Sequence, residues 1–151
     1  MLDKGTSGFS FTPRVLAISM GLLFVEGQIV VAQNDTFNPD CGIELIGHRG
    51  YSGLFPENTL IALEEAFKAG IKICEVDVNQ TADGVAVLFH DQPTMSRTAG
   101  ISSDIRDLTW EEIQTLEVGS WKSSVFQGEP IPSLEQALLL AEQYDAQLYL
   151  D

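Results

Sequence analysis

The chain has 151 residues, of which 8 are Lys or Arg and 22 are Asp or Glu, so its formal net charge is −14. A length of about 150 residues usually corresponds to one domain, and 44% apolar with 20% charged residues is typical of a globular protein. The acidic excess argues against a nucleic-acid-binding protein, because such proteins need clustered Lys and Arg to displace counterions. Two cysteines are too few for a disulfide-rich scaffold, and neither has the spacing of a zinc ligand.

The first 32 residues have the organisation of a secretory leader. Lys4 and Arg14 precede an apolar run at 15–25, and residues 30–32 provide small or modest side chains before a predicted cleavage point. The apolar run is shorter than the ~20 residues that span a bilayer as a helix. We predict that residues 1–32 are a signal peptide or signal anchor, so that the protein is secreted, periplasmic or membrane-anchored. A buried core segment is the alternative, and membrane contact is expected only if the leader is retained.

A polar linker at 33–42 separates this leader from a predicted domain at 43–151. Cys41 precedes the first predicted strand of the domain, whereas Cys74 lies within the second. An oxidising compartment would permit a bridge between them. We favour two free thiols.

The domain alternates between strand and helix patterns. Runs of apolar residues predict strands at 43–48, 71–78, 85–90 and 147–151. A helix at 60–69 follows Asn58 and Thr59, either of which can cap it, and two further helices begin at the capping boxes of Thr109 and Ser133. This order of elements, with short loops, predicts an α/β fold with a largely parallel sheet and helices outside it.

Polar side chains gather at the carboxyl end of each predicted strand. In chain order they are His48, Arg49, Glu75, Asp77, His90, Asp91 and Asp151. Such ends converge on the ligand site of a parallel α/β sheet or barrel. Glu75 and Asp77 are two apart in a strand, so both carboxylates point to one face and need a cation between them. Carboxylate oxygens suit Ca²⁺ or Mg²⁺ better than zinc.

Several motifs occur together, in the order and at the spacing found in one enzyme family. They are HRG at 48–50, PENT at 56–59, EVD at 75–77, TADG at 81–84, FHD at 89–91, RT at 97–98, LT at 108–109 and IPSLEQA at 131–137. Over residues 43–151 the chain resembles the glycerophosphodiester phosphodiesterases. The resemblance implies a TIM (β/α)₈ barrel. A full barrel takes ~250 residues, so this chain is expected to hold about the first four strands.

The resemblance also implies a role for each polar residue at the strand ends. His48 and His90 correspond to the catalytic acid–base pair, and Arg49 corresponds to the residue that contacts the phosphate. The implied ligands of one divalent cation, Ca²⁺ or Mg²⁺, are Glu75, Asp77 and Asp151. Asp151 stands where the family usually has a Glu, which is one methylene longer.

The implied reaction is metal-dependent hydrolysis of glycerophosphodiesters to sn-glycerol 3-phosphate and an alcohol, within glycerol and lipid metabolism. Arg49 and the cation would hold the anionic phosphodiester, and two histidines would divide the proton transfers between them. Two alternatives stay open: a lysophospholipase D-type activity on lysophospholipids, and a truncated half barrel without catalytic activity. The HRG and PENT motifs argue against a third relationship, to spider-toxin-like phospholipases D. The oligomeric state, the headgroup preference and the division of labour between the histidines are not fixed by the sequence.

Overall fold

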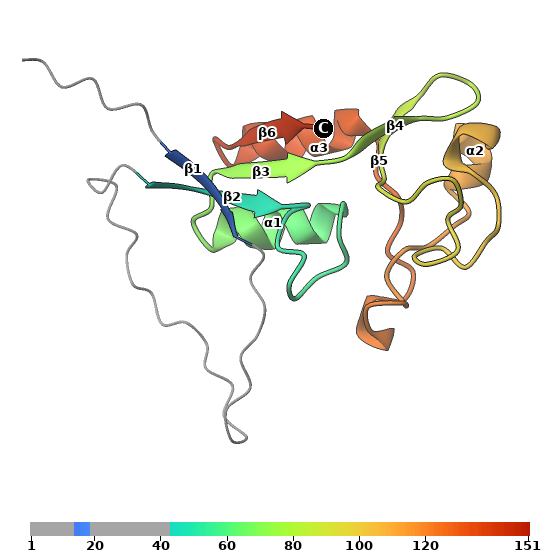
Figure 1. The fold of residues 1–151 in the computed structure, drawn as a ribbon, viewed down its shortest axis with the longest axis horizontal. Coiled ribbons are helices and arrows are strands. Elements are labelled where there is room, and N and C mark those ends of the chain that lie inside the picture. The colour runs from blue at the N-terminus through green and yellow to red at the C-terminus, as the bar shows by residue number, and fades with distance from the viewer. Residues whose placement is uncertain (1–13, 19–42) are drawn as a thin grey trace, which may run out of the picture.

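The computed structural model describes residues 14–18 and 43–151, and its centre is a four-stranded parallel sheet (Figure 1). The strand order is β1 (Arg14–Ile18), β2 (Ile43–His48), β3 (Ile73–Val76) and β6 (Gln147–Leu150). The register places His48 beside Glu75, and Glu75 beside Tyr149. Because the strands are parallel, their carboxyl ends lie along one edge of the sheet.

Helices α1 (Leu60–Lys68) and α3 (Leu134–Gln143) pack against each other and against the sheet. Their apolar residues recur every three or four positions, so one face of each helix is buried. These faces share a single core cluster, which contains Leu63, Ala66, Phe67, Cys74, Val76, Leu88, Ala137 and Ala141. Thr59 caps α1, and Ser133 and Gln136 form the predicted capping box of α3. Packing against these helices therefore fixes the positions of β3 and β6, whose carboxyl ends carry the polar residues.

The strand predicted at 85–90 differs from the expectation in its partner and length. It appears as β5 (Ala86–Leu88), which pairs antiparallel with β4 (Val78–Gln80) in a separate two-stranded sheet. A parallel crossover needs about a dozen residues or more, whereas the turn at 81–85 connects the two strands directly. The Phe89 N–H still donates to the Asp77 carbonyl oxygen at 2.9 Å, so the end of β5 returns to the end of β3.

A second core cluster lies under the segment between β5 and α3. It contains Val87, Phe89, Met95, Ile105, Ile113, Val118 and Ile131. This segment contains three short helices, η2 (Ile105–Asp107), α2 (Trp110–Ile113) and η3 (Ser124–Phe126). The capping box predicted at Thr109 is present, with Glu112 as its partner. This cluster fixes the loop that carries His90.

Most of the predicted leader and linker lies outside the described residues. The part that is described, Arg14–Ile18, forms β1 and pairs with β2, with Ala17 opposite Ile46. Among the described residues, no helix has the length and apolar character needed to cross a membrane. Cys74 is buried and forms no disulfide within the described residues, and burial raises the pKa of its thiol to about 12. Cys41 lies outside the described residues, so the pairing state of the two cysteines stays a prediction.

We expect Leu63→Ala to lower the free energy of unfolding by about 2–5 kcal/mol, because it leaves a cavity at a fully buried position. Urea unfolding of the full chain measures this loss. The control is Leu138→Ala on the exposed face of α3, which should change stability by less than about 0.5 kcal/mol. Equal losses in the two variants would contradict the core assigned to α1.

Candidate active site

Three acidic side chains meet at the carboxyl edge of the main sheet. Glu75 belongs to β3, Asp77 follows it, and Asp151 comes directly after β6. Each offers one carboxylate oxygen, and these three oxygens all lie within 4.8 Å of one another. The side chains of Glu75 and Asp77 are only 17% and 13% exposed. The structure thus gathers the three carboxylates that the family resemblance implies as ligands of one cation.

Backbone hydrogen bonds hold Asp151 beside the other two acids. The Asp151 N–H donates to the Val76 carbonyl at 3.0 Å, and the Val78 N–H donates to the Asp151 carbonyl at 2.9 Å. These bonds continue the ladder between β3 and β6 beyond the ends of both strands. The position of the Asp151 backbone therefore depends on strand pairing.

Electrostatics in this cluster favour a bound cation. Burial, followed by the neighbouring charge of Asp77, raises the pKa of Glu75, although the Arg49 backbone N–H bonds to its carboxylate at 3.0 Å. Crowded carboxylates raise one another's pKa when no positive charge compensates them. The donor set consists of hard oxygens, which fits Ca²⁺ or Mg²⁺. Glu75, Asp77 and Asp151 are the residues that would hold such an ion.

The turn after β2 gives Arg49 an unusual backbone. Arg49 has φ 56° and Gly50 has φ 77°, so both lie in the left-handed region. A Cβ at Gly50 would lie 2.7 Å from the backbone of Ala62, so only glycine lets the turn approach α1 this closely. Left-handed non-glycine residues are costly and recur at functional sites. The turn directs the Arg49 backbone N–H at Glu75.

The Arg49 side chain lies between two acids. Its Nη1 donates to Glu57 Oε1 at 2.9 Å. Its Nε lies 3.0 Å from Asp77 Oδ2, but this buried nitrogen has no aligned hydrogen-bond acceptor among the described residues. The contact with Asp77 is therefore a charge contact, which positions the guanidinium beside the carboxylate cluster.

Asn58 orients Asp77, a role that the sequence did not reveal. Its Nδ2 donates to Asp77 Oδ2 at 2.8 Å, and its Oδ1 accepts from the Asp77 N–H at 3.1 Å. Asn58 is buried and left-handed, with φ 57°. Its sequence position predicted only a possible helix cap, and Thr59 fills that role instead. The PENT motif contains Asn58, but the motif alone does not indicate that its partner is Asp77.

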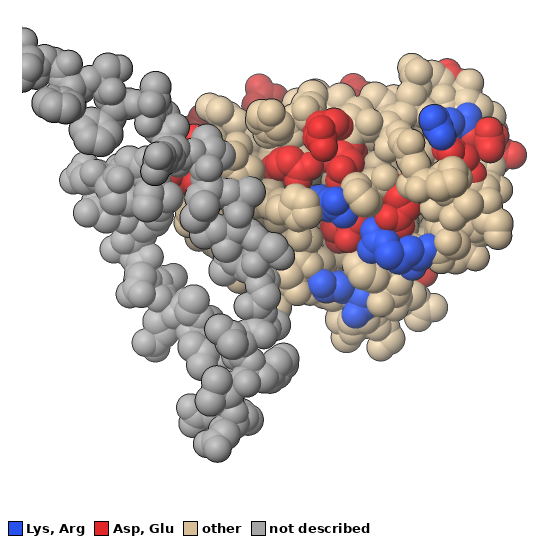
Figure 2. Space-filling model, in the orientation of Figure 1, with Lys and Arg blue, Asp and Glu red and all other residues tan. Residues whose placement is uncertain are grey.

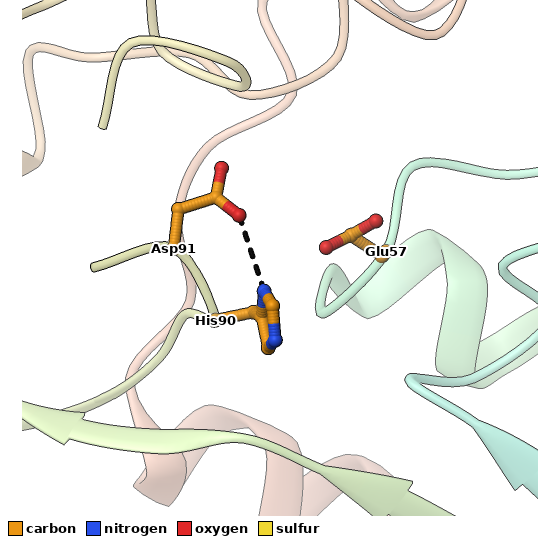
Figure 3. Close-up of side chains that lie close together, drawn as sticks. All are labelled: Glu57, His90 and Asp91. Atoms are coloured by element: carbon orange, nitrogen blue, oxygen red, sulfur yellow. Dashed lines mark hydrogen bonds and ion pairs between the residues drawn. The ribbon is translucent and has the colours of Figure 1, made fainter. Parts of the chain in front are cut away.

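The two histidines lie at different strand ends. His48 closes β2, and its Nε2 lies 3.9 Å from Glu75 Oε2. His90 follows β5, and its Nδ1 lies 3.1 Å from Asp91 Oδ1 (Figure 3). Both side chains are 44% exposed, so each can meet a dissolved ligand. His90 reaches this region from the hairpin and not from a strand of the main sheet.

His90 belongs to a second cluster of titratable side chains, together with two acids. Glu57, His90 and Asp91 point toward one another in Figure 3, and one ligand atom from each lies within 4.8 Å of the others. Burial opposes ionisation of both acids, but hydrogen bonds and charge from Arg97 prevail and lower the pKa of Glu57 and of Asp91. Acidic and basic side chains lie side by side over the middle of the molecule in Figure 2.

Residues 48–149 match the model of the Glycerophosphoryl diester phosphodiesterase family. The chain belongs to this family. A glycerophosphodiester phosphodiesterase of Caldanaerobacter subterraneus is 39% identical over 101 residues, which cover 67% of this chain and 41% of the relative. The fold is also similar to an Oleispira antarctica phosphodiesterase, solved in complex with the product sn-glycerol-3-phosphate. The TM-score is 0.68 and the identity 42%, over 71% of this chain and 43% of that one.

A glycerophosphodiester phosphodiesterase structure from Agrobacterium tumefaciens is similar as well, with TM-score 0.67 and 33% identity over 71% of this chain and 46% of that one. These relatives are TIM-barrel enzymes, which confirms the predicted fold class. The chain spans less than half the length of each of these relatives. Its described residues form an open sheet and not a closed barrel.

We predict that a divalent cation stabilises the folded chain through the three carboxylates. At a free ion concentration of about 100 times the dissociation constant, the gain should be about 2.7 kcal/mol. Glu75→Gln should lose most of this gain, yet match or exceed the wild type in chelator because it removes one of three crowded charges. Thermal unfolding with Mg²⁺, Ca²⁺ or chelator measures both effects.

The matched control is Glu65→Gln, which removes an acid on α1 that pairs with Lys68. This variant should keep the full stabilisation by the ion. An equal gain in Glu75→Gln and the wild type would contradict the assigned ligands.

Proposed function

We propose that this chain carries the residues that bind and cleave a glycerophosphodiester, releasing sn-glycerol 3-phosphate and an alcohol. The observation that carries the proposal is the convergence of Glu75, Asp77 and Asp151 beside Arg49, in a member of this family. The bound sn-glycerol-3-phosphate of the Oleispira antarctica relative supports the choice of product.

Arg49 is proposed to bind the substrate phosphate. Its Nη1 and Nε already face Glu57 and Asp77, so Nη2 is the guanidinium nitrogen best placed for a phosphoryl oxygen. A divalent ion, Ca²⁺ or Mg²⁺, held by the three carboxylates would supply further positive charge at the phosphoryl group. Positive charge is needed because the phosphodiester is an anion and the chain is strongly acidic.

His48 and His90 are proposed to divide the proton transfers. One accepts the proton of the attacking oxygen, which belongs to water or to the glycerol 2-hydroxyl. Attack by the 2-hydroxyl would give a cyclic phosphodiester, which a water molecule must then open to give sn-glycerol 3-phosphate. As the new P–O bond forms and the old one breaks, the other gives a proton to the departing alcohol oxygen. Asp91 accepts from Nδ1 of His90, so Nε2 is the nitrogen of His90 that faces the reaction.

We expect hydrolysis of glycerophosphocholine by the purified chain to require Mg²⁺ or Ca²⁺ and to stop in chelator. His48→Ala and His90→Ala should each lower kcat by about 10²-fold or more, because each removes one proton transfer. A colorimetric assay for released choline follows the reaction, with Glu65→Gln as the control that retains activity.

The alternative is a half barrel that binds ligand without turnover, and the observation that favours it is the open sheet formed by the described residues. A folded chain that binds sn-glycerol 3-phosphate but does not hydrolyse the diester would establish this alternative. Hydrolysis of a lysophospholipid in preference to glycerophosphocholine would instead point to a lysophospholipase D-type activity.

The secretory location is a proposal that rests on residues 1–32 alone. Expression with an intact leader should yield a chain cleaved after Ala32, which intact-mass measurement detects. A full-length soluble chain would instead favour the core-segment alternative, in which Arg14–Ile18 stays paired with β2.

A further inference from the structure

Glu57 has a carboxylate that is shared by two arginines. It lies in the turn before α1, and its side chain is only 15% exposed. Its Oε1 accepts from Arg49 Nη1 at 2.9 Å and from Arg97 Nη2 at 2.6 Å, while Oε2 accepts from Arg97 Nη1 at 3.2 Å. Hydrogen bonds between guanidinium and carboxylate are short and directional, so Glu57 restricts both guanidinium groups.

Arg97 extends these contacts toward His90. Its Nη2 and Nε donate to Asp91 Oδ1 at 2.6 and 3.1 Å, and its guanidinium carbon lies 4.8 Å from the centre of the Trp121 ring. Asp91 in turn accepts from His90 Nδ1. The planar fork of an arginine can hold two carboxylates at a fixed separation, as it does here for Glu57 and Asp91.

These contacts form one continuous path. In order, it runs through Asp77, Arg49, Glu57, Arg97, Asp91 and His90. It begins in the carboxylate cluster at the end of β3 and ends at the second histidine. Glu57 is the central link, since the two arginines meet on its Oε1.

We infer that Glu57 is a positioning residue, which fixes the Arg49 guanidinium for the substrate phosphate and, through Arg97 and Asp91, fixes the ring of His90. This inference rests on the proposed function. A metal ion is the competing occupant of Glu57, His90 and Asp91, but the two guanidinium groups already occupy these carboxylates. An ion would have to displace them.

A positioning role and a purely electrostatic role of Glu57 predict opposite changes in phosphate affinity when its charge is removed. A carboxylate near an anion site repels the anion, so removing its charge alone would tighten phosphate binding. If its main effect is to orient Arg49, removing it weakens binding, because the guanidinium no longer keeps one geometry. The sign of the change in affinity therefore separates the two.

The test is binding of sn-glycerol 3-phosphate to the full chain with Mg²⁺, measured by calorimetry. Glu57→Gln should bind about tenfold more weakly, which corresponds to loss of a charge-assisted hydrogen bond. Glu65→Gln, the matched surface control, should bind as the wild type does. Unchanged or tighter binding by Glu57→Gln would overturn the inference.

A double-mutant cycle separates positioning from general stability. In an Arg49→Gln background, Glu57→Gln should have little further effect on affinity, because the influence of Glu57 on phosphate binding passes through Arg49. An equal loss in both backgrounds would overturn the inference. If Glu57→Gln does not fold, Glu57→Asp replaces it, and wild-type affinity in that folded variant would be the contradicting result.

A third readout needs neither turnover nor ligand. ¹⁵N relaxation of the Arg49 Nε–H should report an ordered guanidinium in the wild type and a mobile one in Glu57→Gln. Equal order in both would overturn the inference. Absence of hydrolysis by the wild type would contradict the proposed activity of the chain but would leave this comparison intact.

Discussion

Three carboxylates held within 4.8 Å of one another are the constraint around which the rest of the structure is arranged. Like charges this close repel, so the fold must hold them against that repulsion until a cation compensates it. Strand pairing holds the backbone of Asp151, and the left-handed turn after β2 directs a backbone N–H at the Glu75 carboxylate. Asn58 forms hydrogen bonds with both the side chain and the backbone N–H of Asp77. Each acid thus has its own restraint, and the three restraints come from different parts of the chain.

Two arginines supply positive charge beside these acids. The chain carries a net charge of −14, yet Arg49 and Arg97 lie among the acids at the strand ends. The two guanidinium groups together contact three carboxylates, Glu57, Asp77 and Asp91, so the charges of Glu75 and Asp151 are left for a cation to compensate. A cation held by the carboxylates would add the positive charge that an anionic phosphodiester needs in so acidic a chain.

Local patterns predicted most of the fold because they depend on neighbours in the sequence. Helical spacing predicted α1 and α3, and the capping boxes predicted the starts of α2 and α3. The motifs contain both histidines and the acids Glu75, Asp77 and Asp91, whereas Asp151 was found from its place at the end of a predicted strand. The direction of β5 was missed, although the short turn after β4 already excluded a parallel crossover. The links made by Asn58 and Glu57 were missed for a different reason. Asn58 contacts Asp77, 19 residues away, and Glu57 joins Arg49 to Arg97, which is 40 residues away from Glu57, so only the folded chain brings these partners together.

The position of a bound cation is the most direct test of this arrangement, because two acidic groups lie near each other at the strand ends. A crystal of the chain soaked with Mn²⁺ would reveal the ion in an anomalous difference map. We expect one peak bonded to the carboxylates of Glu75, Asp77 and Asp151. A peak among Glu57, His90 and Asp91 instead, or no peak beside Glu75, would contradict the assignment of the cluster at the end of β3 as the cation site.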